Sequence, residues 1–151
     1  MKSSLFRKSL ALASALLLFF LASITLAADV ASDVEKILID IRQDQPVPKL
    51  DYLKKAAPIN ADSAYYQGNY KGIEIAVEAH PNSNKVASIL LKITGADQTR
   101  AILPAVSRAI GKPHHSSPKN SQYSWTWKKY RTGSLHYDAG ERLTIVSLFY
   151  Q

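Results

Sequence analysis

Hydrophobic and polar residues alternate most clearly near the end of the chain, between Ser121 and Gln151. The stretch is rich in Val, Ile, Tyr, Phe, Trp and Thr, which are typical of pleated strands. Two three-residue segments within it, Arg131–Gly133 and Asp138–Gly140, end in glycine. Glycine adopts the left-handed conformation that closes a three-residue hairpin loop. The pattern predicts a three-stranded antiparallel meander with these segments as its loops.

Loops of this length set the register, so that Trp127 faces Tyr137 and Leu135 faces Leu143. Side chains alternate between the two sides of a strand. The predicted core face consists of Tyr123, Trp125, Trp127, Leu135, Tyr137, Leu143, Ile145 and Phe149. The other face is mixed and consists of Ser124, Thr126, Lys128, Tyr130, His136, Thr144, Val146, Leu148 and Tyr150. A register shift of one residue would exchange the two faces.

A second strand pair is predicted upstream. Residues 71–80 alternate between apolar and polar positions, Pro81–Asn84 is a turn cluster, and residues 86–94 return as a strand. This pairing would place Val77 beside Ile89 on the core side. A short strand at Tyr65 and Tyr66 precedes the pair.

Three helices are predicted. The first covers residues 32–43, where Ser32 and Glu35 have the spacing of a capping box. A shorter one covers residues 50–57 and ends before a proline. The third covers residues 97–110, with Asp97 as its cap and a Gly-x-Pro stop after it. Pro104 should either kink this helix or mark its true first turn.

The order of these elements predicts an α+β fold, a two-layer sandwich with helices on one face of an antiparallel sheet. Residues 70–93 and 130–150 are weakly alike. Each begins with Tyr and a basic residue, and each carries an acidic residue followed by Ala at the end of its first strand. A tandem α-β-β(-β) repeat would explain this likeness, and so would the general resemblance of one hairpin to another, so both interpretations stay open.

Residues 1–27 have the organisation of a secretory signal peptide. Lys2, Arg7 and Lys8 precede an apolar run, and Thr25–Ala27 provides small residues for cleavage. An uncleaved membrane anchor is the alternative, but the apolar run is short for a span of about 20 residues. We therefore expect a single domain over residues 28–151, exported to a Gram-negative periplasm or secreted.

Composition limits the kinds of partner and chemistry. The chain of 151 residues has no cysteine, which excludes a disulfide framework and a lipidated cysteine. The leader carries three of the 19 basic residues and none of the 12 acidic ones, which leaves a net charge of +4. This mild charge favours acidic protein surfaces or anionic envelope components over nucleic acid.

At residues 101–151 the chain resembles a known unit. An apolar helix is followed by Ala109-Ile110-Gly111-Lys112-Pro113, the Tyr123–Trp127 strand, Leu135-His136-Tyr137 and a final strand. This order resembles the α-β-β-β unit of the small outer-membrane assembly lipoproteins, the SmpA/OmlA family. Tandem copies of such units resemble the β-lactamase inhibitor protein fold. The resemblance implies a fold and a habit of binding proteins, and it implies no chemistry. The lipid-bearing cysteine of that family is missing here, so an anchored assembly role does not carry over.

No pattern of catalytic residues stands out. His114 and His115 are adjacent, and with His80 and His136 they lack the spacing of a metal site. Glu74 and Glu78 on one strand would lie about 13 Å apart, too far for a catalytic pair of carboxylates that act as general acid and general base. Trp125, Trp127 and Tyr123 could stack a sugar or a base, but core packing explains them better. We therefore expect no enzyme activity, no cofactor and no metal.

The sequence favours an exported binding protein that occludes another protein, such as an inhibitor or an immunity protein against a toxin, effector or envelope enzyme. The predicted contact residues are Glu74, Glu78, Lys128, Tyr130, His136, Leu148 and Tyr150. One alternative is an accessory of envelope assembly or maintenance that binds peptidoglycan or a membrane complex. Another is a small hydrolase that uses His114 or His115. The sequence identifies neither the partner nor the oligomeric state.

Overall fold

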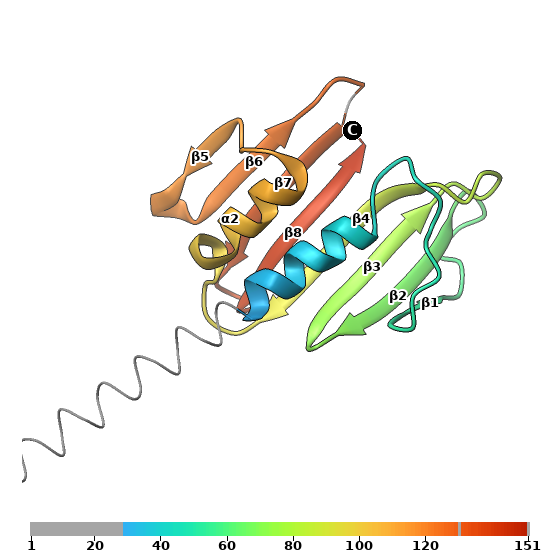
Figure 1. Ribbon diagram of the computed structural model, residues 1–151, viewed down its shortest axis with the longest axis horizontal. Coiled ribbons are helices and arrows are strands. Elements are labelled where there is room, and N and C mark those ends of the chain that lie inside the picture. The colour runs from blue at the N-terminus through green and yellow to red at the C-terminus, as the bar shows by residue number, and fades with distance from the viewer. Residues whose placement is uncertain (1–28, 130, 151) are drawn as a thin grey trace, which may run out of the picture.

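The computed structural model describes residues 29–129 and 131–150. The predicted leader and Tyr130 therefore lie outside the described residues. Eight antiparallel strands form one open sheet in the order β1-β2-β3-β4-β8-β7-β6-β5 (Figure 1). The strands are β1 (Leu53–Lys55), β2 (Ala64–Tyr70), β3 (Ile73–Ala79), β4 (Val86–Thr94), β5 (His115–Ser117), β6 (Gln122–Thr126), β7 (Arg131–Asp138) and β8 (Leu143–Tyr150).

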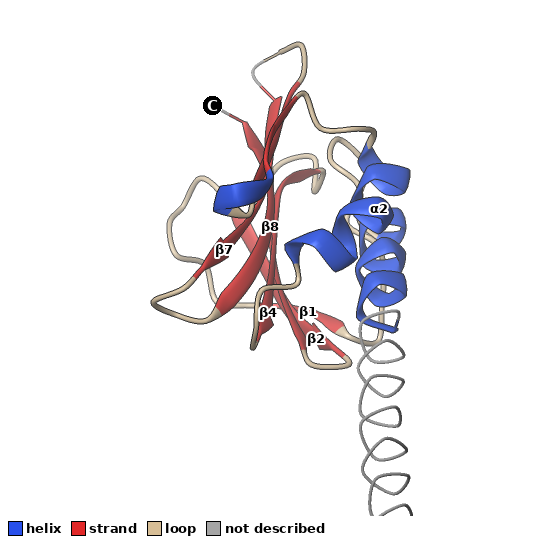
Figure 2. Cartoon of the chain, turned by 90° about the vertical axis from the view of Figure 1, so that its left-hand side faces the viewer, coloured by secondary structure: helices blue, strands red, loops and turns tan. Residues whose placement is uncertain are grey.

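Both α-helices among the described residues pack on the same side of this sheet (Figure 2). One covers residues 29–40, and the other is α2 (Thr99–Ile110). A 3₁₀ turn, η1 (Pro118–Asn120), joins β5 to β6. Apolar side chains of the helices meet the inner face of the central strands, and this contact is the core. The predicted α+β class and the two-layer arrangement are confirmed.

Several elements lie where the hydrophobic pattern predicts them. Strands β3 and β4 form the expected hairpin, and Val77 pairs with Ile89 on the buried side. Helix α2 begins at Thr99 with Gln98 at its N-cap position, so the prediction of Asp97 as the cap is wrong by one residue. Asp97 Oδ1 still accepts hydrogen bonds from the Thr99 N–H at 2.8 Å and from the Thr99 hydroxyl at 2.7 Å. Pro104 lies inside the helix, and Gly111 ends it with a positive φ of 97°.

The predictions for the first two helices need correction. Residues 29–31 are already helical, so Ser32 and Glu35 do not form a capping box. The helix predicted over residues 50–57 is wrong, because β1 occupies its centre and pairs with β2. Strand β2 is longer than predicted and includes Gly68. A Cβ on Gly68 would lie 2.0 Å from the carbonyl oxygen of Tyr52, so only glycine lets β1 approach this closely.

The register of the meander also differs from the prediction. Arg131–Gly133 belongs to β7 rather than to a loop, and Trp125 pairs with Gly133. The turn comes earlier, where the Trp127 N–H donates to the carbonyl of Arg131 at 2.9 Å. Gly133 is a packing residue, because an added Cβ would lie 2.9 Å from Leu148 and 3.2 Å from the Trp127 ring. A glycine that ends a loop and a glycine that makes room for a neighbour look the same in a sequence.

The β7–β8 connection differs too: Asp138 pairs with Leu143, so the loop is the four residues 139–142 rather than Asp138–Gly140, and this change reverses the phase of β8. Thr144, Val146 and Leu148 are buried on the helix side, where Val146 pairs with Leu135. Leu143, Ile145 and Phe149, predicted as core, face the other side instead. Trp125 keeps its predicted position, with 1% of its surface exposed and its indole N–H donating to the Gly111 carbonyl at 2.8 Å.

Candidate functional site

The side of the sheet opposite the helices is uncovered among the described residues, and we call it the open face. A straight row of cross-strand partners crosses its middle from β4 to β5. The row consists of Leu90, Ser147, Ser134, Ser124 and His115. The hydroxyl oxygens of Ser134 and Ser147 lie 2.8 Å apart. The middle of the open face is therefore a row of serine hydroxyl groups between Leu90 and His115.

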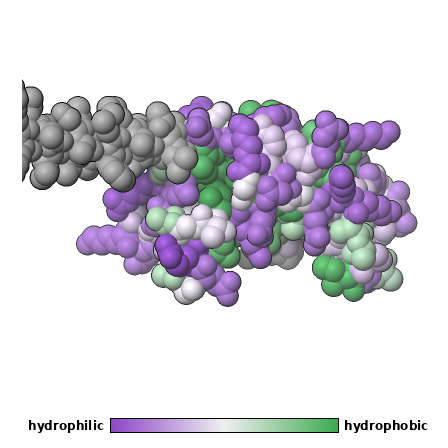
Figure 3. Space-filling view, turned by 90° about the horizontal axis from the view of Figure 1, so that it is seen from below, coloured by the Kyte–Doolittle hydropathy of each residue, from purple (hydrophilic) through white to green (hydrophobic). Residues whose placement is uncertain are grey.

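The apolar residues of the open face are Ala76, Leu90, Leu143, Ile145 and Phe149. Phe149 has 40% of its surface exposed and is the one large apolar side chain in the described strands that is exposed. The side of the molecule shown in Figure 3 is mainly hydrophilic, with separate hydrophobic patches. A mixture of scattered apolar anchors and hydrogen-bonding groups is the composition of many protein-binding surfaces.

Glu78 is held firmly on the first half of the open face. Its carboxylate accepts hydrogen bonds from the hydroxyl groups of Ser63, of Tyr65 at 3.3 Å and of Ser88 at 3.2 Å. Glu74 lies two rows away and is exposed, opposite Lys92 of β4. These contacts fix the position of one negative charge and leave the other open to solvent.

The predicted contact residues do not all share this face. Glu74, Glu78 and His136 are on the open face, and Lys128 is exposed in the turn between β6 and β7. Leu148 is only 5% exposed and lies on the helix side, so the face predicted for it is wrong. Tyr150 is also on the helix side, where its hydroxyl donates to Asp44. Tyr130 lies outside the described residues. The reversed phase of β8 accounts for both corrections.

Residues that the sequence did not single out make up much of the open face. Ser134, Ser147, Ile145 and Phe149 all occupy it. The serines carried a weak signal, because they alternate with buried residues along β7 and β8. Ile145 and Phe149 carried a misleading one, because apolar residues in a strand are normally assigned to the core.

Three hollows mark the open face, and two of them lie one on each half of the sheet. The β5–β7 hollow has a volume of about 430 Å³ and is lined by His115, Ser116, Ser117, Gln122, Tyr123, Ser124, Ser134 and His136. The β2–β4 hollow has a volume of about 360 Å³ and is lined by Gln67, Gly68, Asn69, Glu74, Ile75, Ala76, Leu90 and Lys92. The first is lined by hydroxyl, amide and imidazole groups, and the second contains a carboxylate and an amine. The third has a volume of about 470 Å³ and is lined by Ser63, Glu78, His80, Ala87, Ser88, Phe149 and Tyr150.

The histidines have different surroundings. His114 Nδ1 accepts the Thr126 N–H at 2.8 Å and its ring lies edge-on to Trp127, so this side chain has a structural role. His136 Nδ1 is 3.4 Å from the Ser134 hydroxyl, and no carboxylate bonds to His136 within residues 29–129 and 131–150. A serine–histidine pair without an orienting acid lacks one member of the usual hydrolytic arrangement. The described part of the chain contains no cluster of three or more His, Cys, Asp or Glu side chains placed to hold a metal ion.

Comparison with protein-family models, with curated proteins and with solved structures found no significant match for this chain. Among the described residues, neither helix has the length and apolar character needed to cross a membrane. The functional argument therefore depends on the open face itself.

Proposed function

We propose that this chain is a non-enzymatic binding protein of the cell envelope that docks another protein on its open face. Occlusion of the partner's own site, as by an inhibitor or an immunity protein, is the mode of action that such a face suits best. The observation that carries this proposal is the uncovered side of the eight-stranded sheet, with its hydroxyl rows and exposed Phe149.

The dimensions of the open face suit a protein partner. Seven inter-strand spacings of about 4.8 Å give a width of about 34 Å, and central strands of seven to nine residues are about 25 Å long. The product is close to the ~800 Å² that each partner contributes to a standard protein interface. Leu90, Ile145 and Phe149 would supply the apolar contacts, and the serine rows would supply hydrogen bonds around them.

Other considerations support the same proposal. The organisation of residues 1–27 supports export, to a periplasm or to the medium. The resemblance of residues 101–151 to the unit of the assembly lipoproteins and of the β-lactamase inhibitor protein fold supports protein binding. A role in envelope assembly or maintenance is the second candidate, and the same resemblance favours it.

Photo-cross-linking in the cells that produce the protein tests the proposal. A photoreactive amino acid replaces Ser134 or Ile145 on the open face, and Ala101, exposed on α2, in a control. We expect the two open-face positions to cross-link the same discrete protein and Ala101 to cross-link none. Cross-links only from Ala101, or none from the open face, would refute the proposal. Cross-links to glycan or to a membrane complex would favour the accessory role instead.

A further inference from the structure

The β2–β4 hollow and the β5–β7 hollow of the open face occupy equivalent places in an internally repeated fold. A helix and four strands form each half, and the halves meet at the β4–β8 pair. If Glu78 of β3 is taken as equivalent to Asp138 of β7, then Ile75 is equivalent to Leu135. The strand partners of these two residues, Leu91 in β4 and Val146 in β8, are then equivalent to each other. These two residues are direct partners across β4 and β8, so an approximate two-fold axis passes between them. The same registers match Gln67 of β2 with Gln122 of β6.

The equivalent positions differ in charge. Glu74 in the β2–β4 hollow corresponds to Ser134 in the β5–β7 hollow, and Ala76 corresponds to His136. Lys92, opposite Glu74, corresponds to Ser147, so the β2–β4 hollow contains one carboxylate and one amine and the β5–β7 hollow contains neither. The glutamine at the matched position is the same in both hollows. The β5–β7 hollow therefore keeps hydrogen-bonding groups of similar size but has no carboxylate in its lining.

The surroundings of the two hollows differ in net charge. Residues 98–151 contain eight Lys and Arg against two acidic residues, a net charge of +6. Residues 29–97 contain eight against ten, a net charge of −2. The positive potential of the molecule is thus concentrated in the half that carries the β5–β7 hollow.

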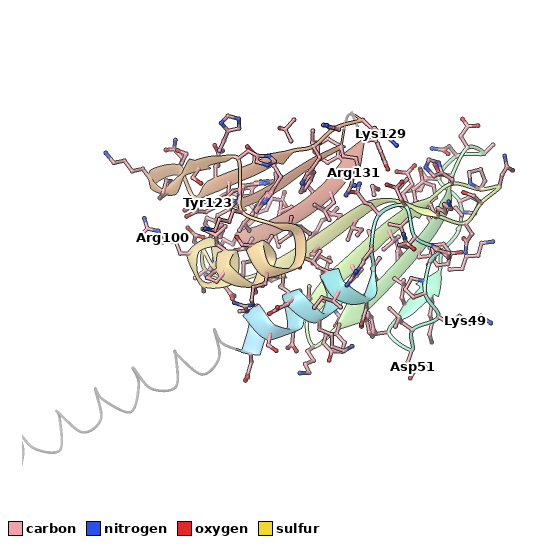
Figure 4. The ribbon with its side chains drawn as sticks, turned by 45° about the horizontal axis from the view of Figure 1, so that its top comes forward. Lys49, Asp51, Arg100, Tyr123, Lys129 and Arg131 are labelled. Carbon is pink, nitrogen blue, oxygen red and sulfur yellow. The ribbon has the colours of Figure 1, made fainter. Side chains whose placement is uncertain are left out.

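Exposed cations flank this hollow at both ends of its strands. Lys128 and Lys129 are in the turn between β6 and β7, and Lys112 precedes β5 at the same end. Lys119 in η1 and Arg142 in the turn before β8 are at the opposite end. None of the five takes part in an ion pair in the part of the chain that the structure describes. Figure 4 shows Lys129 at the β6–β7 turn, far from Arg100 at the start of α2.

We infer that the β5–β7 hollow binds Asp or Glu side chains of an acidic segment on the partner protein. Hydroxyl and imidazole donors in the hollow would bond the carboxylate, and the flanking lysines would attract it over a longer range. A membrane surface or a nucleic acid strand fits less well, because a continuous anion crossing the open face would meet Glu74 and Glu78 on the other half. The inference rests on the proposed function and names the chemistry of the partner.

The test uses the protein purified after export and a synthetic peptide of alternating Glu and Ser, about twelve residues long. In amide NMR spectra, we expect the peptide to shift signals of Gln122, Ser124 and Ser134 and to leave those of Gln67 and Glu74 unchanged. A Lys–Ser peptide of equal length serves as the control for charge. Binding should weaken severalfold between low and high salt, since the attraction comes from exposed charges.

A matched pair of substitutions isolates the effect of charge. Gln122→Glu and Gln67→Glu make the same nearly isosteric change at equivalent, exposed positions of the two hollows. We expect Gln122→Glu to weaken binding of the Glu–Ser peptide about fivefold and Gln67→Glu to change it less than twofold. Equal effects of the two substitutions, or equal binding of the Lys–Ser peptide, would overturn the inference. So would preferential binding to phosphatidylglycerol vesicles.

The outcomes also separate this inference from the proposed function. Suppose that Ser134 cross-links a protein in cells and that Gln122→Glu changes neither this cross-link nor the binding of the peptide. The inference of an acidic partner segment is then wrong, and the open face remains the proposed binding site. If no open-face position cross-links a protein, the proposed function fails whatever the peptide does.

Discussion

Trp125 is the largest fully buried side chain of the described structure, and it joins the sheet to the end of α2. Its indole N–H bonds to the Gly111 carbonyl at 2.8 Å, directly where the helix stops. Trp125→Phe should lower the free energy of unfolding by about 1–3 kcal/mol, because the carbonyl loses its partner and a smaller ring leaves space. Urea denaturation measures this loss. Tyr123→Phe, which removes a hydroxyl without a hydrogen bond among the described residues, should cost less than about 0.5 kcal/mol.

Asp97 links α2 to the start of β6 through Thr99 and Ser121. Burial alone would raise the pKa of this carboxyl, but hydrogen bonds from Ser121 and Thr99 outweigh it and hold the pKa below the ordinary 3.8. The stabilisation is therefore present above pH 3.8 and is lost as the pH falls through the lower pKa of the folded state.

Asp97→Ala should cost about 1 kcal/mol at pH 7, because Thr99 and Ser121 lose their hydrogen-bond acceptor, and the difference from the wild type should narrow in acid. Urea denaturation at pH 7 and pH 3 checks both parts. Asp51→Ala serves as the control, since Asp51 is exposed and forms none of the ion pairs seen among the described residues. A difference that stays constant with pH would contradict the role of the ionised carboxylate.

At the scale of elements, the edge strand β1 depends on a close backbone approach. Gly68→Ala would place a Cβ 2.0 Å from the Tyr52 carbonyl oxygen, and backbone atoms cannot move aside as a side chain can. We expect a loss of about 1–3 kcal/mol and faster amide hydrogen exchange in β1. Gly140→Ala is the matched control, because its Cβ would approach only the Asp138 side chain, at 3.3 Å. Similar losses in the two variants would show that the Tyr52 contact is unimportant.

The sequence predicts elements well where only one face is apolar. Strand β3 alternates strictly, so its buried residues could be assigned before the structure was known. Strand β8 has apolar residues on both faces, with Val146 and Leu148 inside and Ile145 and Phe149 outside. Its phase then depended on the β7–β8 turn, where the three-residue loop predicted at Asp138–Gly140 is in fact the four residues 139–142. The predicted binding residues Leu148 and Tyr150 were misplaced for this reason.

At the scale of the whole molecule, the weak similarity of residues 70–93 and 130–150 corresponds to equivalent strands around one axis. The fold class followed from the order of elements, but the number of strands did not. The missed strands β1 and β5 are three residues each, too short to show a period of two. These brief edges also limit unwanted pairing with other chains.

The central pair β4–β8 has a consequence for the chain as a whole. If the polypeptide were cut after Gly95, β4 would become a nine-residue edge strand of the first fragment, with an apolar face toward the helix. The second fragment would be left with β8 in the same condition. Each fragment alone should aggregate. The two fragments produced together should associate through the β4–β8 strand pair. In the intact molecule each half covers the edge strand that the other half would otherwise expose. Size-exclusion chromatography of the separate and the combined fragments would distinguish aggregates from the reassembled complex.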